Sequence, residues 1–142
     1  MSFQRELLFN VFDEVKPLLT AHHAECASAH KLNPRWEQYA EHERLGGLVI
    51  FTIRTPELAG YGAYFVGPHL QYADLMVAQN SVLYIKPEHR DKAVAFIRFA
   101  EIELQKQGVK KIVYFSTLAR DIRKLLNRLG YADEEVMCGK NF

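Results

Sequence analysis

The sequence predicts an α/β fold, a three-layer mixed β-sheet with helices on both faces. Three observations predict it. Strand-like segments alternate with segments of helical periodicity, a short turn joins two adjacent strand-like segments, and a helix separates two later ones. The turn makes antiparallel neighbours, whereas the helix makes a right-handed parallel crossover. With 142 residues, the chain is expected to form one domain over residues 1–142.

The N-terminal segments predict a strand and then a helix. Residues 2–8 (SFQRELL) are expected to form a short edge strand. Residues 10–30 place apolar side chains at intervals of three and four, which is typical of an amphipathic helix. Pro17 lies inside this segment. Because proline lacks an N–H and disturbs the preceding turn, the helix is expected to start near Pro17 or to be kinked or broken there.

A second helix is predicted over residues 33–46 from the residue types at its two ends. Asn33 is the expected N-cap, and Pro34 suits the first helical position, where a missing N–H costs little. Gly46 follows the last periodic residue, as a glycine does where a helix ends in a left-handed turn. The segment therefore carries a start signal and a stop signal.

The middle of the chain is rich in β-branched and aromatic residues, which favour strands. Residues 47–55 and 60–67 are expected to pair as a hairpin across the turn at 56–60 (PELAG). Residues 67–79 are expected to form a connecting turn and a short irregular strand. Residues 80–87 (NSVLYIKP) then predict the next strand, which ends at its proline.

The last part of the chain alternates helix and strand. A helix follows residue 87 and stops at Gly108, and residues 110–117 (KKIVYFST) predict a strand. Residues 120–130 predict a helix closed by a glycine, and residues 131–140 (YADEEVMCGK) predict a final strand. The first of these helices is expected to have one mostly apolar side, with Val94, Ile97, Ala100, Glu101 and Leu104. The second is expected to face inward with Ile122, Leu125, Leu126 and Leu129.

Composition excludes several classes of protein. The net charge of +1 argues against a protein that mainly coats nucleic acid, and no apolar run reaches the ~20 residues that span a bilayer. The N-terminus lacks the pattern of a signal peptide, and Cys26 and Cys138 show no CxxC spacing, so both are expected as reduced thiols in a cytoplasmic protein. The six histidines form no set of metal ligands, and His22, His23 and His30 are expected at exposed positions.

The junction between the strand at 80–87 and the next helix is a candidate phosphate site. Arg90, Asp91 and Lys92 precede the small residues Ala93 and Ala95 at the helix entrance. A helix start offers free backbone N–H groups and the positive end of the helix dipole, and small residues let a phosphate approach. The alternative is an ordinary strand–helix junction with a solvated loop.

Residues 80–131 resemble motifs A and B of the GNAT (GCN5-related N-acetyltransferase) family. In that family motif A contains V-x-P-x-x-R-G-x-G-x-G, or more loosely Q/R-x-x-G-x-G/A. Here Pro87 is followed by Arg90 at the motif arginine, Ala93 stands at the first glycine, and Ala95 is an allowed ending. The later family signature, close to L-Y-x-x-L-G-F, is similar to LLNRLGY near the end of the chain. The order of elements also fits, and the chain resembles acetyltransferase-like proteins of phages and prophages.

The resemblance implies an acyl-CoA site between the strands at 80–87 and 110–117. The pantetheine arm would pair with the main chain of the first strand, the pyrophosphate would rest on amides of the helix entrance, and acetyl-CoA would be the co-substrate without any metal. An amine acceptor would attack the thioester with help from a base, an acid and a backbone oxyanion donor. The implied binding residues are Leu83, Tyr84 and Ile85 on the strand and Arg90, Asp91, Lys92, Ala93, Val94 and Ala95 at the entrance.

The sequence departs from the family at residues that carry catalysis. The usual acid, the tyrosine of L-Y-x-x-L-G-F, corresponds to Leu126, and a frequent carboxylate base corresponds to Ser81. The asparagine that commonly opens the last helix corresponds to Ala119, and Ala93 adds a methyl group where the pyrophosphate approaches. The resemblance therefore implies binding residues but assigns no catalytic residue.

Two functions follow from these observations. The first is an N-acetyltransferase that moves an acetyl group from acetyl-CoA to an unidentified amine, on a small molecule or a protein. The alternative is a weak or inactive phage protein of the same fold that binds a host protein. Nucleic acid and membrane are not expected partners, a homodimer stays open, and the expected location is the cytoplasm, that of the host for a phage protein.

Overall fold

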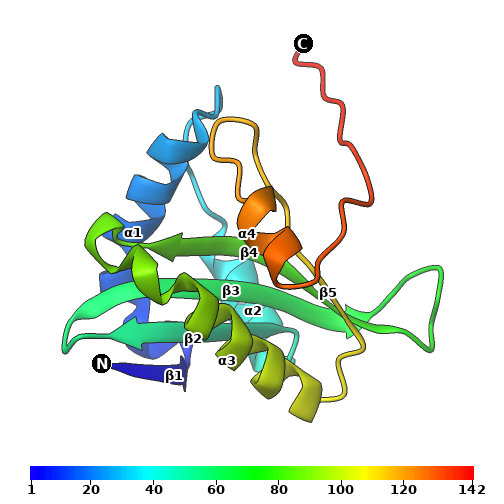
Figure 1. Ribbon diagram of the computed structural model, residues 1–142, viewed down its shortest axis with the longest axis horizontal. Helices are drawn as coiled ribbons and strands as arrows, with labels where there is room; N and C mark the ends of the chain where they lie inside the picture. The colour runs from blue at the N-terminus through cyan, green and yellow to red at the C-terminus, as the bar shows by residue number, and fades with distance from the viewer.

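The computed structural model describes residues 1–142, which form one sheet flanked by helices (Figure 1). The strands are β1 (Ser2–Glu6), β2 (Leu48–Arg54), β3 (Leu58–Pro68), β4 (Met76–Ile85) and β5 (Lys111–Val113), and they lie in the order β1-β2-β3-β4-β5. The helices are α1 (Leu8–Cys26), α2 (Trp36–Arg44), α3 (Ala93–Lys106) and α4 (Arg123–Arg128), with a 3-10 helix η1 (Pro87–Lys92) directly before α3.

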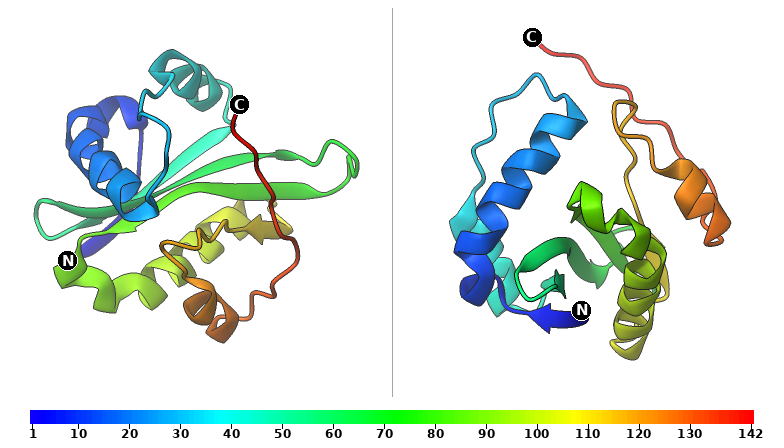
Figure 2. Two further views of the ribbon diagram at one scale, coloured as in Figure 1. Left: turned by 90° about the horizontal axis from the view of Figure 1, so that it is seen from above. Right: turned by 60° about the vertical axis from the view of Figure 1, so that its left-hand side comes forward.

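The sheet is mixed, and helices cover both of its faces. Strands β1 to β4 pair antiparallel, and β5 pairs parallel to β4 after the crossover through α3. Figure 2 shows α1 and α2 on one face of the sheet and α3 and α4 on the other. The predicted three-layer mixed sheet, its hairpin and its parallel crossover are confirmed.

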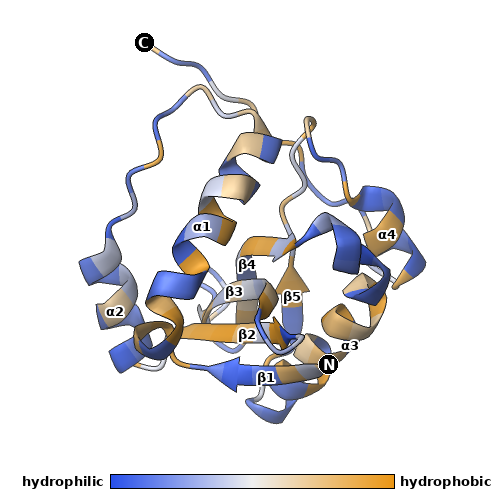
Figure 3. Ribbon diagram, turned by 90° about the vertical axis from the view of Figure 1, so that its left-hand side faces the viewer, coloured by the Kyte–Doolittle hydropathy of each residue, from blue (hydrophilic) through white to orange (hydrophobic).

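The alternation of side chains along each strand divides the core into two halves. In β2, Phe51 packs toward α3 and its neighbour Ile50 packs toward α1, so the strand is buried on both faces. Figure 3 shows the consequence: β2 is hydrophobic along its length, whereas α2 is mostly hydrophilic and has no buried residue. The central strands therefore form a rigid frame, and α2 lies at its margin.

Strand β4 is the element that shapes the candidate site. Val82 pairs with Ala63 and Asn80 with Tyr64, so Ser81 is an extra residue, a β-bulge, opposite β3. On its other edge β4 pairs with β5 only from Val77 to Gln79. Past that point β4 has a neighbour strand on one side alone, and its outer edge faces the region where the backbones of β4 and β5 separate, which we call the opening.

Three helix ends follow the sequence prediction. Gly46, Gly108 and Gly130 each come just after a helix and have φ of +79°, +88° and +96°. At Gly130 the next N–H, that of Tyr131, donates to the carbonyl of Leu126 at 3.0 Å. This pattern satisfies carbonyls that the end of a helix leaves free, and it needs a left-handed residue that glycine provides without strain.

Two predictions about the helices need correction. Helix α1 runs continuously from Leu8 to Cys26, so it neither starts near Pro17 nor breaks there, and a kink at Pro17 stays a prediction. Packing of its apolar face on the sheet outweighs the hydrogen bond that proline removes. Helix α2 begins after Arg35, whose carbonyl accepts the N–H groups of Gln38 and Tyr39, and not at Asn33.

Two predicted strands in the second half of the chain have other bounds than expected. The strand predicted at 80–87 begins earlier, at Met76, so that part of the segment 67–79 belongs to β4. The strand predicted at 110–117 is reduced to β5, which is three residues long. The predicted strand at 131–140 is wrong, because these residues form no strand. Val136 and Met137 in it are 90% and 91% exposed, so the segment buries no apolar face that could hold it as a strand.

The close approach of β3 to β4 yields a test of this packing. A Cβ at Gly60 would lie 2.8 Å from the backbone oxygen of Tyr84, whereas a Cβ at Gly67 on the same strand would meet nothing within 4 Å. We expect Gly60→Ala to lower the free energy of unfolding by about 1–3 kcal/mol and Gly67→Ala to change it by less than about 0.5 kcal/mol. Urea unfolding of the two variants measures this difference, and equal effects would contradict the register.

Candidate functional site

The outer edge of β4 presents main-chain groups to the opening. The N–H of Lys86 donates to the carbonyl of Ala59 at 2.9 Å, so alternate residues from Lys86 backward face β3. The groups of Leu83 and Ile85 face the opposite way. They form the free edge of the strand, and the resemblance implied main-chain pairing with a ligand here.

Two arginine side chains bind these outward carbonyls. Arg120, in the turn before α4, donates from Nη1 to the carbonyl of Leu83 at 2.9 Å. Arg90, in η1, donates from Nε to the carbonyl of Ile85 at 3.0 Å. Each carbonyl on this edge of the strand therefore has a charged partner in place of a neighbouring strand.

One carboxylate holds both arginines. Glu25, near the C-terminal end of α1, pairs through Oε1 with Arg90, and its Oε2 lies 2.9 Å from Nε of Arg120. The second contact is an ion pair without the alignment of a hydrogen bond, because that oxygen has no hydrogen-bond partner. The side chain of Glu25 thus joins three segments far apart in sequence: the end of α1, η1 and the turn before α4.

The predicted phosphate-binding residues lie together but not in an open loop. Arg90, Asp91 and Lys92 form part of the 3-10 helix, and the N–H of Ala93 donates to the carbonyl of Arg90. Lys92 pairs with Asp91 at 2.8 Å. Ala93 packs against the core on the α3 side, while Ala95 is exposed. Val94 is exposed too, so the prediction that it faces the core is wrong. The N–H of Ala93 at the start of α3 is therefore already used by a hydrogen bond within η1.

His22 is a half-buried member of this group, whereas the sequence predicted an exposed position for it. Its Nδ1 is buried without a hydrogen-bond partner, its Nε2 lies 3.5 Å from Sγ of Cys26, and its ring lies edge-on to Tyr84. Burial, with a further effect from the charge of Arg120, lowers its pKa to about 4. The imidazole is therefore neutral at pH 7.

Helical spacing offered part of this signal. Glu25 and Cys26 lie three and four residues after His22, so a helix places each of them next to His22. Nothing in the local sequence shows that this face meets Arg90 and Arg120, which lie 65 or more positions further along the chain.

A cluster of hydroxyl groups lies on the α3 side of the opening. The hydroxyls of Tyr64 and Tyr114 are hydrogen-bonded at 2.7 Å, and the hydroxyl of Tyr131 donates to Oε1 of Glu101 at 3.0 Å. The rings of Tyr114 and Tyr131 pack edge-on at 5.2 Å between centroids. Burial raises the pKa of each of the three tyrosines, so all stay protonated through the neutral range.

The positions that depart from the GNAT pattern fall in different environments. Leu126, at the place of the family tyrosine, is 5% exposed and belongs to the core on the α3 side. Ser81 is the exposed residue of the bulge, and Ala119 lies in the turn before α4. Leu126 thus serves packing, and a phenol could enter only by displacing core side chains.

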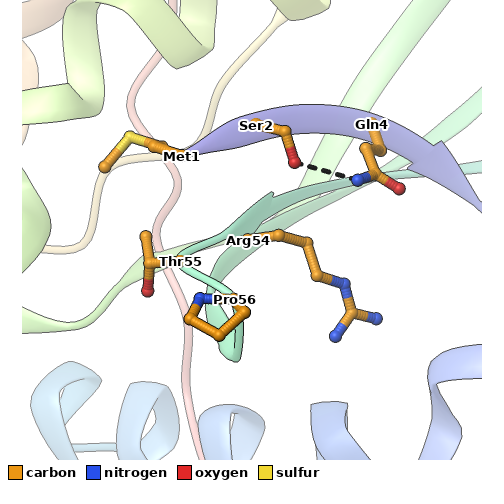
Figure 4. Close-up of a pocket in the computed structure, with 6 residues that line it drawn as sticks. All are labelled: Met1, Ser2, Gln4, Arg54, Thr55 and Pro56. Atoms are coloured by element: carbon orange, nitrogen blue, oxygen red, sulfur yellow. Dashed lines mark hydrogen bonds between the residues drawn. The ribbon is translucent and has the colours of Figure 1, made fainter.

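A separate cavity lies at the opposite edge of the sheet. It has a volume of about 570 Å³ and is lined by Met1, Ser2, Gln4, Arg54, Thr55 and Pro56 (Figure 4). The positive charge of Arg54 in its lining is already paired, because the guanidinium donates to Glu6 at 3.0 Å and to Glu14 at 2.6 Å. The site at β4 therefore carries the stronger case for ligand chemistry.

Two other classes of feature are absent from the structure. No group of three or more His, Cys, Asp or Glu side chains is placed to hold a metal ion. None of the helices has both the length and the apolar character needed to cross a membrane.

No model of a known protein family matches the sequence, and no curated protein matches it. Solved structures match over nearly the whole chain. The ribosomal-protein-alanine N-acetyltransferase of Brucella melitensis biovar Abortus has a TM-score of 0.73 at 18% identity, covering 100% of both chains. An aminoglycoside acetyltransferase from an uncultured soil metagenomic sample has a TM-score of 0.74 at 12% identity, covering 99% of this chain and 95% of that one.

A third neighbour is a predicted acetyltransferase from Clostridium acetobutylicum, solved with acetyl-CoA. It has a TM-score of 0.71 at 12% identity and covers 99% of this chain and 95% of that one. At such low identities the likeness establishes the fold. The chain has the acyl-CoA N-acyltransferase (GNAT) fold that the sequence predicted.

The half-buried imidazole of His22 predicts a dependence of stability on pH. His22 binds its proton near pH 4 in the folded state and near its ordinary value of 6.5 in the unfolded chain. Between these values the unfolded state holds more protons, so stability falls as pH falls from about 6.5 to 4, by about 1–3 kcal/mol. Urea unfolding across this range should show the loss in the parent and in His30→Gln, whose imidazole is exposed. The loss should shrink in His22→Gln, and an unchanged profile there would contradict the burial.

Proposed function

We propose that this protein is an acyl-CoA-dependent N-acetyltransferase that moves an acetyl group from acetyl-CoA to an amine. One observation carries the proposal: past Gln79 the outer edge of β4 lacks a neighbouring strand, and two arginines converge on it. An extended ligand with its own amides can pair with such an edge as an added strand does. Acetyl-CoA has that chemistry in its pantetheine arm and carries phosphates beyond it.

When acetyl-CoA binds in this way, its amides replace the two arginines as hydrogen-bond partners of the β4 carbonyls. The pantetheine amides take the carbonyls of Leu83 and Ile85, so Arg120 and Arg90 leave them. The freed guanidiniums then face the phosphate groups, which arginine binds well through paired N–H donors. The amides from Arg90 to Ala95 add donors to the pyrophosphate as the entrance to α3 opens.

The reaction needs only a positioned amine and thioester. The amine nitrogen attacks the carbonyl carbon, the C–N bond forms, and the C–S bond breaks with its electron pair on sulfur. The amine loses a proton to a base or to water, and the sulfur of CoA gains one. A backbone N–H of β4 near the bulge stabilises the oxyanion that develops on the carbonyl oxygen.

The neighbours support amine acylation without selecting the acceptor. By their names they acetylate a ribosomal protein, aminoglycosides or glucosamine 6-phosphate, so one fold serves proteins and small molecules. The acceptor of this protein is therefore an amine of unassigned type. A phage origin remains a prediction from the resemblance, a cytoplasmic location remains a prediction from the sequence, and a homodimer stays open.

The same arginine contacts also favour a second function. If Arg90 and Arg120 close the edge of β4 permanently, the protein uses the fold without acyl-CoA and binds a partner protein, such as a host protein of a phage. Leu126 in the core, where the family has its acid, agrees with this alternative.

Acetyl-CoA binding is the first test. We expect calorimetry to show binding, and acetyl-CoA at ~100 times its dissociation constant should stabilise the fold by about 2.7 kcal/mol and raise Tm. Desulfo-CoA keeps the arm and the phosphates, so it should bind as well, whereas adenosine should not. If millimolar acetyl-CoA produces neither heat nor a shift in Tm, the transferase proposal is lost and the partner-binding function leads.

The role of Glu25 as the restraint on both arginines can be tested separately. Glu25→Gln removes the charge that holds the arginines and repels phosphates, so acetyl-CoA should bind about 3- to 10-fold more tightly, as expected for two partly exposed ion pairs. Glu41→Gln removes an ion pair with Arg44 on α2 and serves as the matched control, with no change in affinity. Weaker or equal binding in Glu25→Gln would show that the arginines do not compete with the ligand.

A further inference from the structure

Asn80 is a buried polar side chain at the point where β4 and β5 separate. It is 5% exposed, and it follows Gln79, the last residue of β4 that pairs with β5. Its side-chain nitrogen donates to the carbonyl of Val82 at 2.8 Å and to that of Ala63 on β3 at 3.3 Å. The amide therefore bridges from one side of the bulge at Ser81 to the other side and to the neighbouring strand.

The bulge decides which main-chain groups of β4 face the opening. Before the bulge, the carbonyl of Met76 accepts the N–H of Lys110, so it faces the β5 side. After the bulge, the outward carbonyls are those of Leu83 and Ile85, which the two arginines bind. Alternate residues of a regular strand face the same way, so an even-numbered residue and two odd-numbered ones share this edge only because of the extra residue.

The side chains of β4 show the same shift. Ala78 packs in the core on the α3 side, whereas Val82 and Tyr84, also at even positions, pack in the core on the α1 side. These side chains hold the register before and after the bulge, because a slip by one residue would turn them to the wrong face. Ser81 itself is exposed, so side-chain packing does not hold the bulge, and the hydrogen bonds of Asn80 remain to fix its shape.

The amide of Asn80 is matched to the groups that it contacts. A bulge interrupts the ladder of a strand pair, and buried carbonyls without partners are costly. A carboxamide nitrogen carries two hydrogens, so one side chain binds the carbonyls of Val82 and Ala63 together. A buried polar group that meets its partners in this way makes the local backbone rigid.

The proposed function, on which this inference rests, puts the reacting group of acyl-CoA beside this bulge. With the phosphates near Arg90 and the arm along Ile85 and Leu83, the acetyl group lies beyond Leu83, toward Ser81. There a main-chain N–H of β4 has to meet the carbonyl oxygen of the thioester. A misplacement of about 1 Å at such a contact lowers the rate by about 10²-fold.

We propose that Asn80 is a positioning residue for acetyl transfer: its amide fixes the bulge of β4 and thereby aligns the main chain with the thioester. Asn80 itself does not touch the substrate. It pairs across the sheet with Tyr64, a residue of the core on the α3 side, and paired residues share a face of the sheet. Asn80 therefore acts through the backbone to which it is bonded.

The infrared stretching frequency of the acetyl carbonyl in bound, isotope-labelled acetyl-CoA tests this role without an acceptor. A hydrogen bond to the carbonyl oxygen lowers this frequency, so the parent complex should absorb at lower frequency than free acetyl-CoA. In Asn80→Ala the frequency should return at least halfway to the free value. Calorimetry should find the affinity for acetyl-CoA within about 3-fold of the parent, because the edge at Leu83 and Ile85 keeps its register.

Asn80→Asp adds a pH profile as a second measurement. A carboxylate in this place repels both carbonyls, whereas the protonated carboxyl has the shape of the amide and donates to Val82. Burial raises the pKa of such a carboxyl above its ordinary value of about 3.9. The carbonyl frequency in Asn80→Asp should therefore approach that of the parent as pH falls from about 8 to 5, with no such change in the parent.

Transfer to hydroxylamine as a probe amine, followed by chromatography of released CoA, gives the kinetic measure. With saturating acetyl-CoA, Asn80→Ala should be about 10²-fold slower than the parent, with little change in KM for acetyl-CoA. Thr52→Val is the matched control. Thr52 is the other buried residue of polar type, and its hydroxyl donates to Glu6 at the pairing of β1 with β2, away from β4. Its loss should lower Tm and leave the carbonyl frequency and the rate unchanged.

The outcomes separate the two proposals. No acetyl-CoA binding by the parent overturns both of them. If Asn80→Ala binds acetyl-CoA with the parent's carbonyl frequency and rate, Asn80 serves stability alone, and the transferase proposal stands. A folded Asn80→Ala that no longer binds acetyl-CoA also overturns the positioning role, because the amide then serves binding of the arm. If Asn80→Ala does not fold, the pH profile of Asn80→Asp decides, and a frequency that does not change with pH overturns the role.

Discussion

The unequal pairing of β4 is the constraint on which the rest of the structure depends. One edge of this strand is bonded to β3 along its length, and the other is bonded to β5 for three residues only. A bulge at Ser81 lies just past the point where β5 leaves. The strand thereby changes from a central strand to an edge strand inside the molecule, and the backbone groups of its outer half must find partners other than a strand.

Arginine side chains supply those partners, and their position links the two faces of the sheet. Arg90 and Arg120 cover the carbonyls of Ile85 and Leu83, and Glu25 from the opposite helical layer holds them there. Ion pairs of partly exposed groups contribute little stability each, so these contacts protect the edge without closing it irreversibly. The same exposed main chain that makes β4 a liability for aggregation makes it suited to an extended amide ligand.

Local patterns in the sequence were enough for most of the fold. The hairpin of β2 and β3, the crossover through α3 and the glycine stops depend on neighbouring residues, whose periodicity and backbone preferences are written locally. Errors arose where distant packing decided: α1 continues through Pro17 because its apolar face rests on the sheet, and residues 131–140 form no strand because they bury nothing. The local preferences of the residues for helix or strand predict neither the continuous α1 nor the lack of a strand at 131–140.

For the site, the sequence alone predicted, by family resemblance, binding to the β4 main chain and to the Arg90 region, because pairing with the backbone tolerates changes of side chain. The tertiary structure alone brought Glu25 to Arg120, buried Nδ1 of His22, and joined Tyr64 to Tyr114. These contacts connect residues tens of positions apart. They arise from how the sheet and its helical layers pack, and no periodicity or spacing along the chain encodes which distant side chains will meet.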